Sequence, residues 1–200
     1  MKLTRANQVT IFRVLLILPF VICMLKVNNP NFGTLVRYAA LVIFLLMAAG
    51  DAYDGYLARK RNQVTKLGSF LDPMADKLLM TCACLLLASD RAAVNGFKLP
   101  PTVVVLIIGK DLFLLLGFVI VYFMTFQVHI IPAYIGKIAS FLQMSMVTAI
   151  LIAPEVSKAM PGWIWFLRFL WWSAAGTAII TTLIYIQAGS HYIEDFEELK

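Results

Sequence analysis

Six long runs of apolar residues alternate with short polar connectors along this chain of 200 residues. The runs lie near residues 8–26, 36–58, 70–89, 101–126, 133–153 and 162–188. Each run holds about twenty residues or more, the length that an α-helix needs to cross the hydrocarbon core of a bilayer. A backbone in lipid must satisfy its hydrogen bonds within itself, so each run is expected to form a helix. The pattern therefore predicts an all-α integral membrane bundle of six transmembrane helices.

The connectors between the runs contain residues that favour turns. These residues are Asn28, Asn29, Pro30, Pro100, Pro101, Pro154, Pro161 and Gly162. No stretch has the composition of a soluble domain, a repeat or a low-complexity segment. We therefore expect a single membrane domain over residues 1–200, ending in a short acidic cytoplasmic tail at residues 189–200.

The composition agrees with a membrane protein, since 61% of the residues are hydrophobic and 14% are charged. Soluble domains average about 45–50% apolar and about 25% charged residues. The net charge of +6 is spread among apolar runs, so it indicates a membrane surface and not a nucleic acid as the partner. Cys23, Cys82 and Cys84 all lie inside apolar runs, where helix packing is a better explanation than a disulfide or a thiolate metal site.

Basic residues in the connectors indicate the orientation, because cytoplasmic loops carry more Lys and Arg. With the N-terminus inside, the cytoplasmic side holds Lys2, Arg5, Arg59, Lys60, Arg61, Lys66 and Lys200. The other side holds Lys26, Arg37, Arg91, Lys98 and Lys158. This bias predicts that both termini are cytoplasmic and that the loop around Arg59 faces the cytoplasm.

Four aspartates stand out at the ends of two apolar runs. Asp51 and Asp54 are three residues apart, and Asp72 and Asp76 are four apart, so on helices each pair occupies one face. Carboxylates beside lipid-like sequence need a function or a strong partner. Asp76 next to Lys77 is one possible ion pair, but neighbouring helical residues project about 100° apart, so we expect such acids to need other partners. The same expectation holds for Asp111 next to its neighbour Lys110.

Two helix ends that each contribute a carboxylate pair can converge on divalent metal ions. Oxygen ligands without nearby cysteine or paired histidine suit Mg²⁺, Mn²⁺ or Ca²⁺ better than zinc. Four carboxylates held together repel one another, whereas two divalent ions neutralise them. Paired metals about 3.5–4 Å apart recur in displacement at phosphorus, and Arg59 is placed to reach the oxygens of a metal-bound pyrophosphate.

Two other kinds of protein also place acids in membranes. A transporter uses intramembrane carboxylates to carry protons or cations, and it has no need of Arg59. A non-catalytic assembly subunit uses small residues such as Gly50, Gly55 and Ala58 for helix packing alone. A transporter would carry its substrate across a membrane without releasing a reaction product. An assembly subunit would tolerate alanine at Asp51 with only an effect on stability.

The acidic segment resembles a family signature in both identity and spacing. The pattern D-x2-D-G-x2-A-R-x8-G-x3-D-x3-D is matched by Asp51, Asp54, Gly55, Ala58, Arg59, Gly68, Asp72 and Asp76. It is similar to the signature of the CDP-alcohol phosphatidyltransferases. The resemblance implies an integral membrane enzyme that joins a CDP-linked lipid to an alcohol and releases CMP, and it implies the family's habit of forming homodimers.

The resemblance also implies roles for individual residues. Asp51, Asp54 and Asp72 would hold two Mg²⁺ or Mn²⁺ ions. Asp76 would complete the metal site and act as general base on the acceptor hydroxyl. The pocket for the cytidine diphosphate group would be formed by Asp51, Asp54, Gly55, Ala58, Arg59 and Gly68.

The acceptor alcohol is indicated by two further segments. GSFLDPMADKLLM and TRANQVTIFRVLL resemble family members that make phosphatidylglycerol phosphate or cardiolipin, although Ala6 stands where proline is usual. We expect CDP-diacylglycerol as donor and glycerol 3-phosphate as acceptor, with Arg13, Lys110 and Lys137 as buried cations for its phosphate. Each cation has the alternative of partnering Asp111 or a backbone carbonyl. Phosphatidylglycerol, inositol phosphate and serine are the alternative acceptors.

Overall fold

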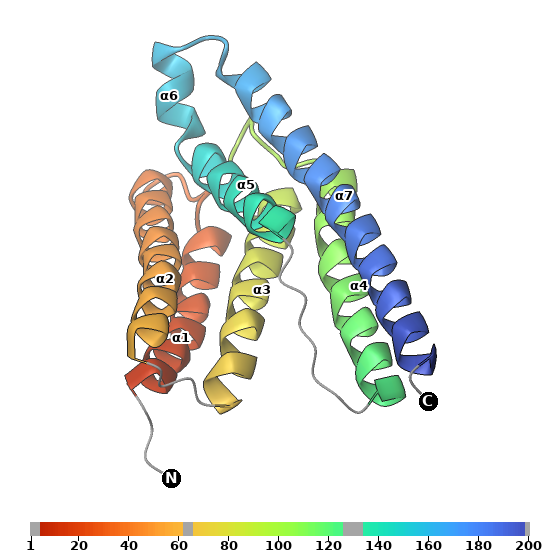
Figure 1. Cartoon of the computed structure of the whole chain (residues 1–200). Coiled ribbons are helices and arrows are strands. Elements are labelled where there is room, and N and C mark those ends of the chain that lie inside the picture. Colours follow the sequence, from red (N-terminus) through yellow and green to blue (C-terminus); the bar gives the residue numbers. More distant parts are fainter. Residues whose placement is uncertain (1–4, 62–65, 126–133, 199–200) are drawn as a thin grey trace. The chain divides into compact units, whose positions relative to one another are not determined.

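The computed structural model describes the backbone of residues 5–61, 66–125 and 134–198, and side chains at residues 12, 14–50, 77–117, 119 and 135–190. Over this part of the chain the secondary structure is helical, as predicted (Figure 1). The helices are α1 (Arg5–Leu25), α2 (Gly33–Arg61), α3 (Lys66–Ala88), α4 (Pro101–Thr125), α5 (Tyr134–Leu151), α6 (Ala153–Ala159) and α7 (Trp163–Glu198).

Six of these helices coincide with the six apolar runs to within a few residues at most ends. Among the described side chains, Gly33–Gly50 of α2 and Trp163–Ser190 of α7 are long and apolar enough to cross a membrane. The number rises to three when α5 and α6 are taken as one bent span. The described part of the chain is thus all-helical, with two or three candidate membrane spans.

Helix α7 differs most from the expected boundaries, because it continues to Glu198. The last apolar run was expected to end at residue 188 and to be followed by a tail over residues 189–200. The polar segment after Ser190 contains no proline and is rich in glutamate, which is a good helix former. The local sequence after Ser190 therefore contains no signal that would end α7 before Glu198.

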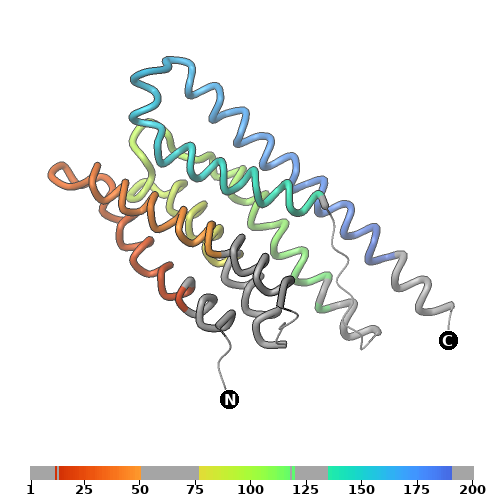
Figure 2. The backbone as a smooth tube through the Cα atoms, turned by 60° about the vertical axis from the view of Figure 1, so that its left-hand side comes forward, coloured from red at the N-terminus to blue at the C-terminus, as the bar shows by residue number. Residues whose placement is uncertain are grey.

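The chain divides into two compact units. The first comprises Met1–Leu99 and Val147–Ile164, and the second comprises Pro100–Met146 and Trp165–Lys200. In the first unit α1 packs against both α2 and α3. Helices α1 and α2 lie side by side and antiparallel in both views (Figures 1 and 2). Their core includes the fully buried rings of Phe20 and Phe44, whose centroids are 5.9 Å apart.

The turn between α1 and α2 requires glycine at its end. The Gly33 amide donates to the Asn29 carbonyl at 2.8 Å. A Cβ atom at Gly33 would lie 2.3 Å from the backbone oxygen of Val27, which is too close for any side chain without movement of the backbone. The absence of a side chain at this position therefore allows the first two helices to pack directly after a short turn.

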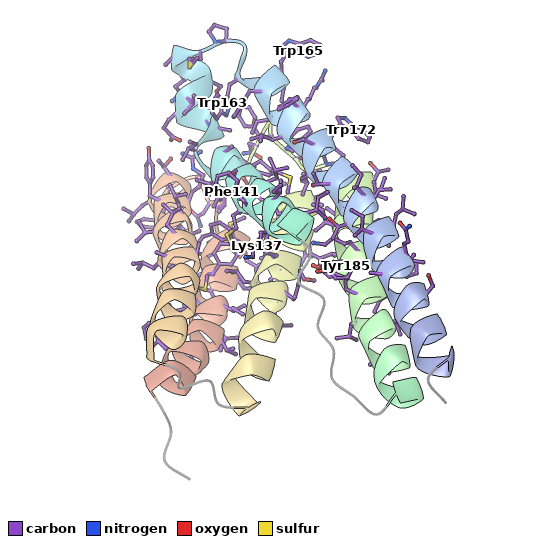
Figure 3. All side chains as sticks on the ribbon, in the orientation of Figure 1. Lys137, Phe141, Trp163, Trp165, Trp172 and Tyr185 are labelled. Atoms are coloured by element: carbon purple, nitrogen blue, oxygen red, sulfur yellow. The ribbon has the colours of Figure 1, made fainter. Side chains whose placement is uncertain are left out.

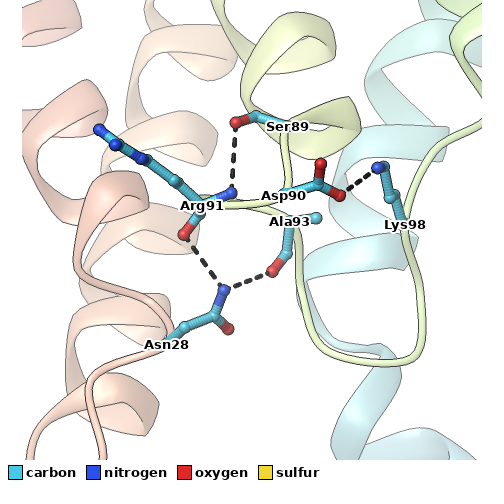
Figure 4. A network of polar contacts seen from close by, with 6 residues as sticks. All are labelled: Asn28, Ser89, Asp90, Arg91, Ala93 and Lys98. Carbon is cyan, nitrogen blue, oxygen red and sulfur yellow. Dashed lines mark hydrogen bonds and ion pairs between the residues drawn. The ribbon is translucent and has the colours of Figure 1, made fainter.

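The connector between α3 and α4 is fastened to that same turn (Figure 4). The Asn28 side-chain amide donates to the carbonyl of Arg91 at 3.2 Å and to that of Ala93 at 3.0 Å. Within the connector, the Arg91 amide donates to the Ser89 hydroxyl at 3.3 Å. One asparagine thus joins two connectors that are more than sixty residues apart in sequence.

The fifth apolar run, expected over 133–153, forms α5 and ends in a bend of 71° between α5 and α6. The Ile152 amide still donates to the Thr148 carbonyl, so the helical bonding reaches the break. Pro154 then lacks an N–H group and cannot continue the pattern. The residue was interpreted as part of a connector, but it lies in the first turn of the short helix α6, a position where proline is tolerated.

The second unit contains α4, most of α5 and most of α7. Hydroxyl groups on α7 are satisfied by the backbone of the same helix, as hydroxyls in an apolar setting need to be. Thr177 donates to the Ser173 carbonyl at 2.9 Å, and Thr181 donates to the Thr177 carbonyl at 2.6 Å. On another side of α7, Trp165 and Trp172 project outward, and the Arg168 guanidinium lies 4.9 Å from the Trp165 ring centroid (Figure 3).

Candidate active site

The four signature aspartates are carried by two helices that follow one another in the first unit. Asp51 and Asp54 belong to the last three turns of α2, and Asp72 and Asp76 to the first half of α3. The structure does not describe the side chains of these four aspartates. The same holds for the other signature residues and the α1 candidate, namely Gly55, Ala58, Arg59, Gly68 and Arg13.

The helix bounds give the aspartates a matching register. With a rise of about 1.5 Å per residue, Asp54 and Asp51 come about 10 and 15 Å before the end of α2, and Asp72 and Asp76 about 9 and 15 Å after the start of α3. Helix α2 ends and α3 begins at the same end of the first unit (Figure 1). The five chain steps between them span at most about 18 Å. Each pair thus lies about 9–15 Å along its helix from the connector between α2 and α3.

The donor set fits divalent metal ions. All four side chains are carboxylates, which suit the hard ions Mg²⁺ and Mn²⁺. Among the described side chains, no group of three or more His, Cys, Asp or Glu residues is arranged to hold a metal ion. Asp51, Asp54, Asp72 and Asp76 are the candidate ligands by their chemistry and their spacing.

Lys110 is paired with its sequence neighbour. Its Nζ atom lies 3.2 Å from Oδ1 of Asp111, and the two side chains are 1% and 10% exposed. The expected burial of Lys110 is confirmed. The two neighbours were expected to project apart, but the long lysine side chain can bend across the angle between them.

Lys137 lies in the first turn of α5 and is exposed, so the prediction that it is buried is wrong (Figure 3). It shares that exposed face with Phe141, four residues further on. The adjacent Gly136 faces α7 instead, since a Cβ atom there would lie 3.5 Å from the Tyr185 hydroxyl. Packing through the glycine leaves Lys137, about 100° around the helix, on an accessible face.

A partly buried ion pair between α2 and α6 was not predicted from the sequence. Arg37, counted there among the connector residues, lies in the second turn of α2, is 5% exposed and binds Glu155 of α6. The guanidinium also lies 5.6 Å from the Tyr38 ring centroid. Arg37 Nε and Glu155 Oε2 are buried without a hydrogen-bond partner. Isolated opposite charges in apolar sequence were the available signal, because each needs a partner.

A cavity of about 580 Å³ lies at the turn between α1 and α2. Its walls include Asn28, Asn31, Thr34, Tyr38 and Asn95. Tyr38 precedes the first signature aspartate by thirteen residues, or about 20 Å along α2. The cavity contains none of the signature residues and is distinct from the candidate active site.

The connector between α3 and α4 carries an exposed ion pair between Lys98 and Asp90 (Figure 4). The hydrogen bond from Lys98 and the charge of its ammonium group hold the pKa of Asp90 below the usual 3.8. This pair belongs to the scaffold, since it lies in a different connector from the signature residues.

Comparison with known proteins decides the family. The model of the CDP-alcohol phosphatidyltransferase family matches residues 3–184. The chain belongs to this family. It is therefore a phosphatidyltransferase, and the resemblance seen in the signature is confirmed over most of the chain.

Several relatives carry the name CDP-diacylglycerol–glycerol-3-phosphate 3-phosphatidyltransferase. The Rickettsia typhi protein is 31% identical over 190 residues, covering 93% of this chain and 97% of the relative. The Bacillus subtilis protein is 33% identical over 150 residues, covering 75% and 73%. The Escherichia coli protein is 41% identical over 86 residues, covering 43% and 44%. The likeness thus extends over nearly the whole length of one such enzyme.

Proposed function

We propose that this membrane protein transfers the phosphatidyl group from CDP-diacylglycerol to glycerol 3-phosphate, giving phosphatidylglycerol phosphate and CMP. The observation that carries the proposal is the complete eight-residue signature on α2 and α3 of a chain that belongs to the CDP-alcohol phosphatidyltransferases. Relatives that align over most of the chain are named for this reaction. Both the catalytic motif and the overall likeness therefore support the same transfer.

Asp76 is the proposed general base. It accepts the proton of the acceptor hydroxyl as the oxygen attacks the lipid-bearing phosphorus, and the bond from that phosphorus to the CMP oxygen breaks. Asp51, Asp54 and Asp72, together with Asp76, would hold two Mg²⁺ or Mn²⁺ ions. Such ions polarise the pyrophosphate and neutralise the charge that develops on the departing CMP.

The residues between the aspartates would bind the nucleotide. Gly55, Ala58 and Gly68 are small and allow close approach of the cytidine diphosphate group to the helix backbones. Arg59 would contact the phosphate oxygens through its planar, always charged guanidinium. Asp51 and Asp54 would contribute to the same pocket from the preceding turns of α2.

Lys137 is the strongest of the three candidate cations for the acceptor phosphate. It is exposed in the first turn of α5, where its ammonium group is accessible to a soluble ligand. The charge of Lys110 is balanced by Asp111, which favours a structural role for that residue. Arg13 on α1 completes the proposed set.

We further propose six membrane spans in one membrane domain, with both termini and the active site at the cytoplasmic face. Six helices follow the six apolar runs, and the basic loop between α2 and α3 supports the orientation. A homodimer in the lipid bilayer is proposed on the family's habit alone.

The decisive experiment supplies the purified protein with CDP-diacylglycerol, Mg²⁺ or Mn²⁺, and one acceptor at a time. The acceptors are glycerol 3-phosphate, phosphatidylglycerol, inositol phosphate and serine. The proposal expects CMP release and phosphatidylglycerol phosphate with glycerol 3-phosphate. Cardiolipin formed from phosphatidylglycerol, with no reaction of glycerol 3-phosphate, would show that the acceptor is wrong while the transfer chemistry stands.

A further inference from the structure

The first turns of α7 present a group of exposed aromatic side chains. Trp165, Phe169 and Trp172 are 69%, 68% and 59% exposed, and the two tryptophans project outward from the helix (Figure 3). The three residues are spaced by four and then three positions, so they occupy one face of the helix. Arg168 is exposed on the same face. These four residues, Trp165, Arg168, Phe169 and Trp172, are here called the aromatic band.

Beyond the aromatic band, the exposed side chains of α7 become aliphatic. They include Ile179, Ile180, Leu183, Ile184 and Ile186. The stretch Trp163–Ser190 is long and apolar enough to cross a membrane. Aliphatic side chains suit the hydrocarbon core of a bilayer, whereas tryptophan is enriched at the level of the lipid headgroups. The change from aromatic to aliphatic side chains therefore indicates where α7 enters the hydrocarbon core.

The length of the span also assigns the aromatic band to the membrane surface. Its 28 residues extend over about 42 Å, whereas the hydrocarbon core is about 30 Å thick. A centred span thus has about 6 Å outside the core at each end, and Arg168 lies about 8 Å from Trp163. Helical side chains point back toward the start of their helix. The Arg168 guanidinium does so, because it lies 4.9 Å from the ring centroid of Trp165, three residues earlier.

Arg168 carries a charge that this stretch of α7 does not balance. It is the only charged residue between Trp163 and Ser190, so the stretch contains no acid that could pair with it. The cation–π contact with Trp165 orients the guanidinium but leaves its positive charge in place. The planar guanidinium matches the geometry of phosphate oxygens. At the headgroup level of a bilayer, the phosphate group of a phospholipid is the anion that meets this requirement.

We infer that the aromatic band is a binding site for an anionic phospholipid in the leaflet at which α7 begins. Arg168 binds the lipid phosphate, Trp165 supports the guanidinium, and the acyl chains lie along Trp172 and the aliphatic face. The band contains a cation and no acid, so it favours a headgroup with net negative charge over a zwitterionic one. The site shares no residue with the signature or the acceptor candidates. The inference therefore stands or falls independently of the proposed reaction.

Tryptophan fluorescence provides the test, because all four tryptophans of the chain lie between residues 163 and 172. The full-length protein is placed in phosphatidylcholine vesicles that contain a fixed fraction of brominated lipid, whose bromine atoms quench tryptophan on contact. One series uses brominated phosphatidylglycerol and the other brominated phosphatidylcholine, both with the bromine atoms near the headgroup end of the acyl chains. The parent should bind the anionic lipid about fivefold more strongly, which is the contribution of a single basic residue near a membrane surface.

Substitutions of Arg168 show whether the preference arises at the aromatic band. Arg168→Gln should abolish it, and Arg168→Lys should keep part of it, because the charge remains without the planar fork. The matched control is Arg91→Gln, which removes an exposed arginine from the connector between α3 and α4 and should leave the preference unchanged. Thermal unfolding in detergent verifies that each variant is folded.

Three results would overturn the inference. The first is equal quenching of the parent by the two brominated lipids. The second is a preference that survives in Arg168→Gln, or that disappears equally in Arg91→Gln and so depends on net charge alone. The third is a lack of quenching by either lipid, because another molecule, such as a second copy of this chain, would then cover the aromatic band.

Discussion

The Nζ atom of Lys110 lies 3.2 Å from Oδ1 of Asp111, so two successive residues of α4 form a buried ion pair. A charge within an apolar helix usually indicates a ligand site or a partner on another helix. Here the lysine finds an acid on its own helix. The pairing explains how α4 accommodates both charges.

Substitution of Lys110 tests this explanation. Lys110→Met removes the ammonium partner of Asp111 and should lower the free energy of unfolding by about 3–5 kcal/mol, because it breaks a buried pair. Adding Asp111→Asn should restore most of that loss, as measured by thermal unfolding in detergent. If the folded variant with both Lys110→Met and Asp111→Asn had a raised KM for glycerol 3-phosphate, Lys110 would contribute to acceptor binding.

Lys137→Ala should instead raise the KM for glycerol 3-phosphate with little change in Tm.

Asp76→Asn should abolish turnover but leave binding of CDP-diacylglycerol largely unchanged. Loss of a general base typically slows a reaction about 10²–10⁴-fold, whereas an amide of the same size leaves most contacts in place. The measurements are CMP release and binding of CDP-diacylglycerol. Asp90→Asn, in an exposed connector, serves as the control and should be fully active. Near-normal turnover of Asp76→Asn would show that another group accepts the proton.

Removal of divalent metal should stop the reaction reversibly. EDTA is expected to abolish CMP release, and added Mg²⁺ or Mn²⁺ to restore it. The reason is that the divalent ions neutralise the mutual repulsion of the four aspartates. The same ions should raise the Tm of the parent protein by stabilising the folded state. This shift should be missing in Asp51→Asn and Asp72→Asn. A full metal-dependent Tm shift in both variants would place the ions elsewhere.

Gly33→Ala should destabilise the turn between the first two helices. The new Cβ atom would lie 2.3 Å from the Val27 carbonyl oxygen, so the backbone must move. Overpacking of this kind costs about 1–3 kcal/mol. Gly176→Ala is the control, because no atom lies within 4 Å of the Cβ position there. Equal Tm values for the two variants would contradict the predicted clash.

The pair of Asp90 with Lys98 should contribute to stability only above acidic pH. Lys98 lowers the pKa of Asp90 below the usual 3.8. A pKa that is lower in the folded state stabilises the protein above the unfolded pKa, and this contribution disappears as the pH falls through the folded value. The Tm difference between the parent and Lys98→Gln should therefore be present near neutral pH and disappear as the pH falls through the lowered pKa of Asp90. A Tm difference that persists at low pH would show that it arises from packing of the Lys98 side chain and not from its charge.

The helices were predictable because their signal is local. A run such as 101–126 contains its own length and hydropathy, and α4 matches it almost to the residue. The break after α5 was harder to predict, since Pro154 is compatible with either a loop or the first turn of a new helix. The proline alone does not decide between them.

The ion pairs were not predictable in the same way. Arg37 and Glu155 are 118 residues apart, so nothing in the local pattern of either one names the other. Lys137 shows the converse error, because a charge near an apolar run was read as buried although packing through Gly136 leaves it exposed. The signature aspartates were recognisable because their spacing itself carries the chemistry.

Helix α1 contains none of the four aspartates, yet it packs against both helices that carry them. Its buried side chains, among them Phe20 and Met24, belong to the core of the first unit. In the proposed site, a helix that supplies no ligand would therefore influence the distance between the two aspartate pairs.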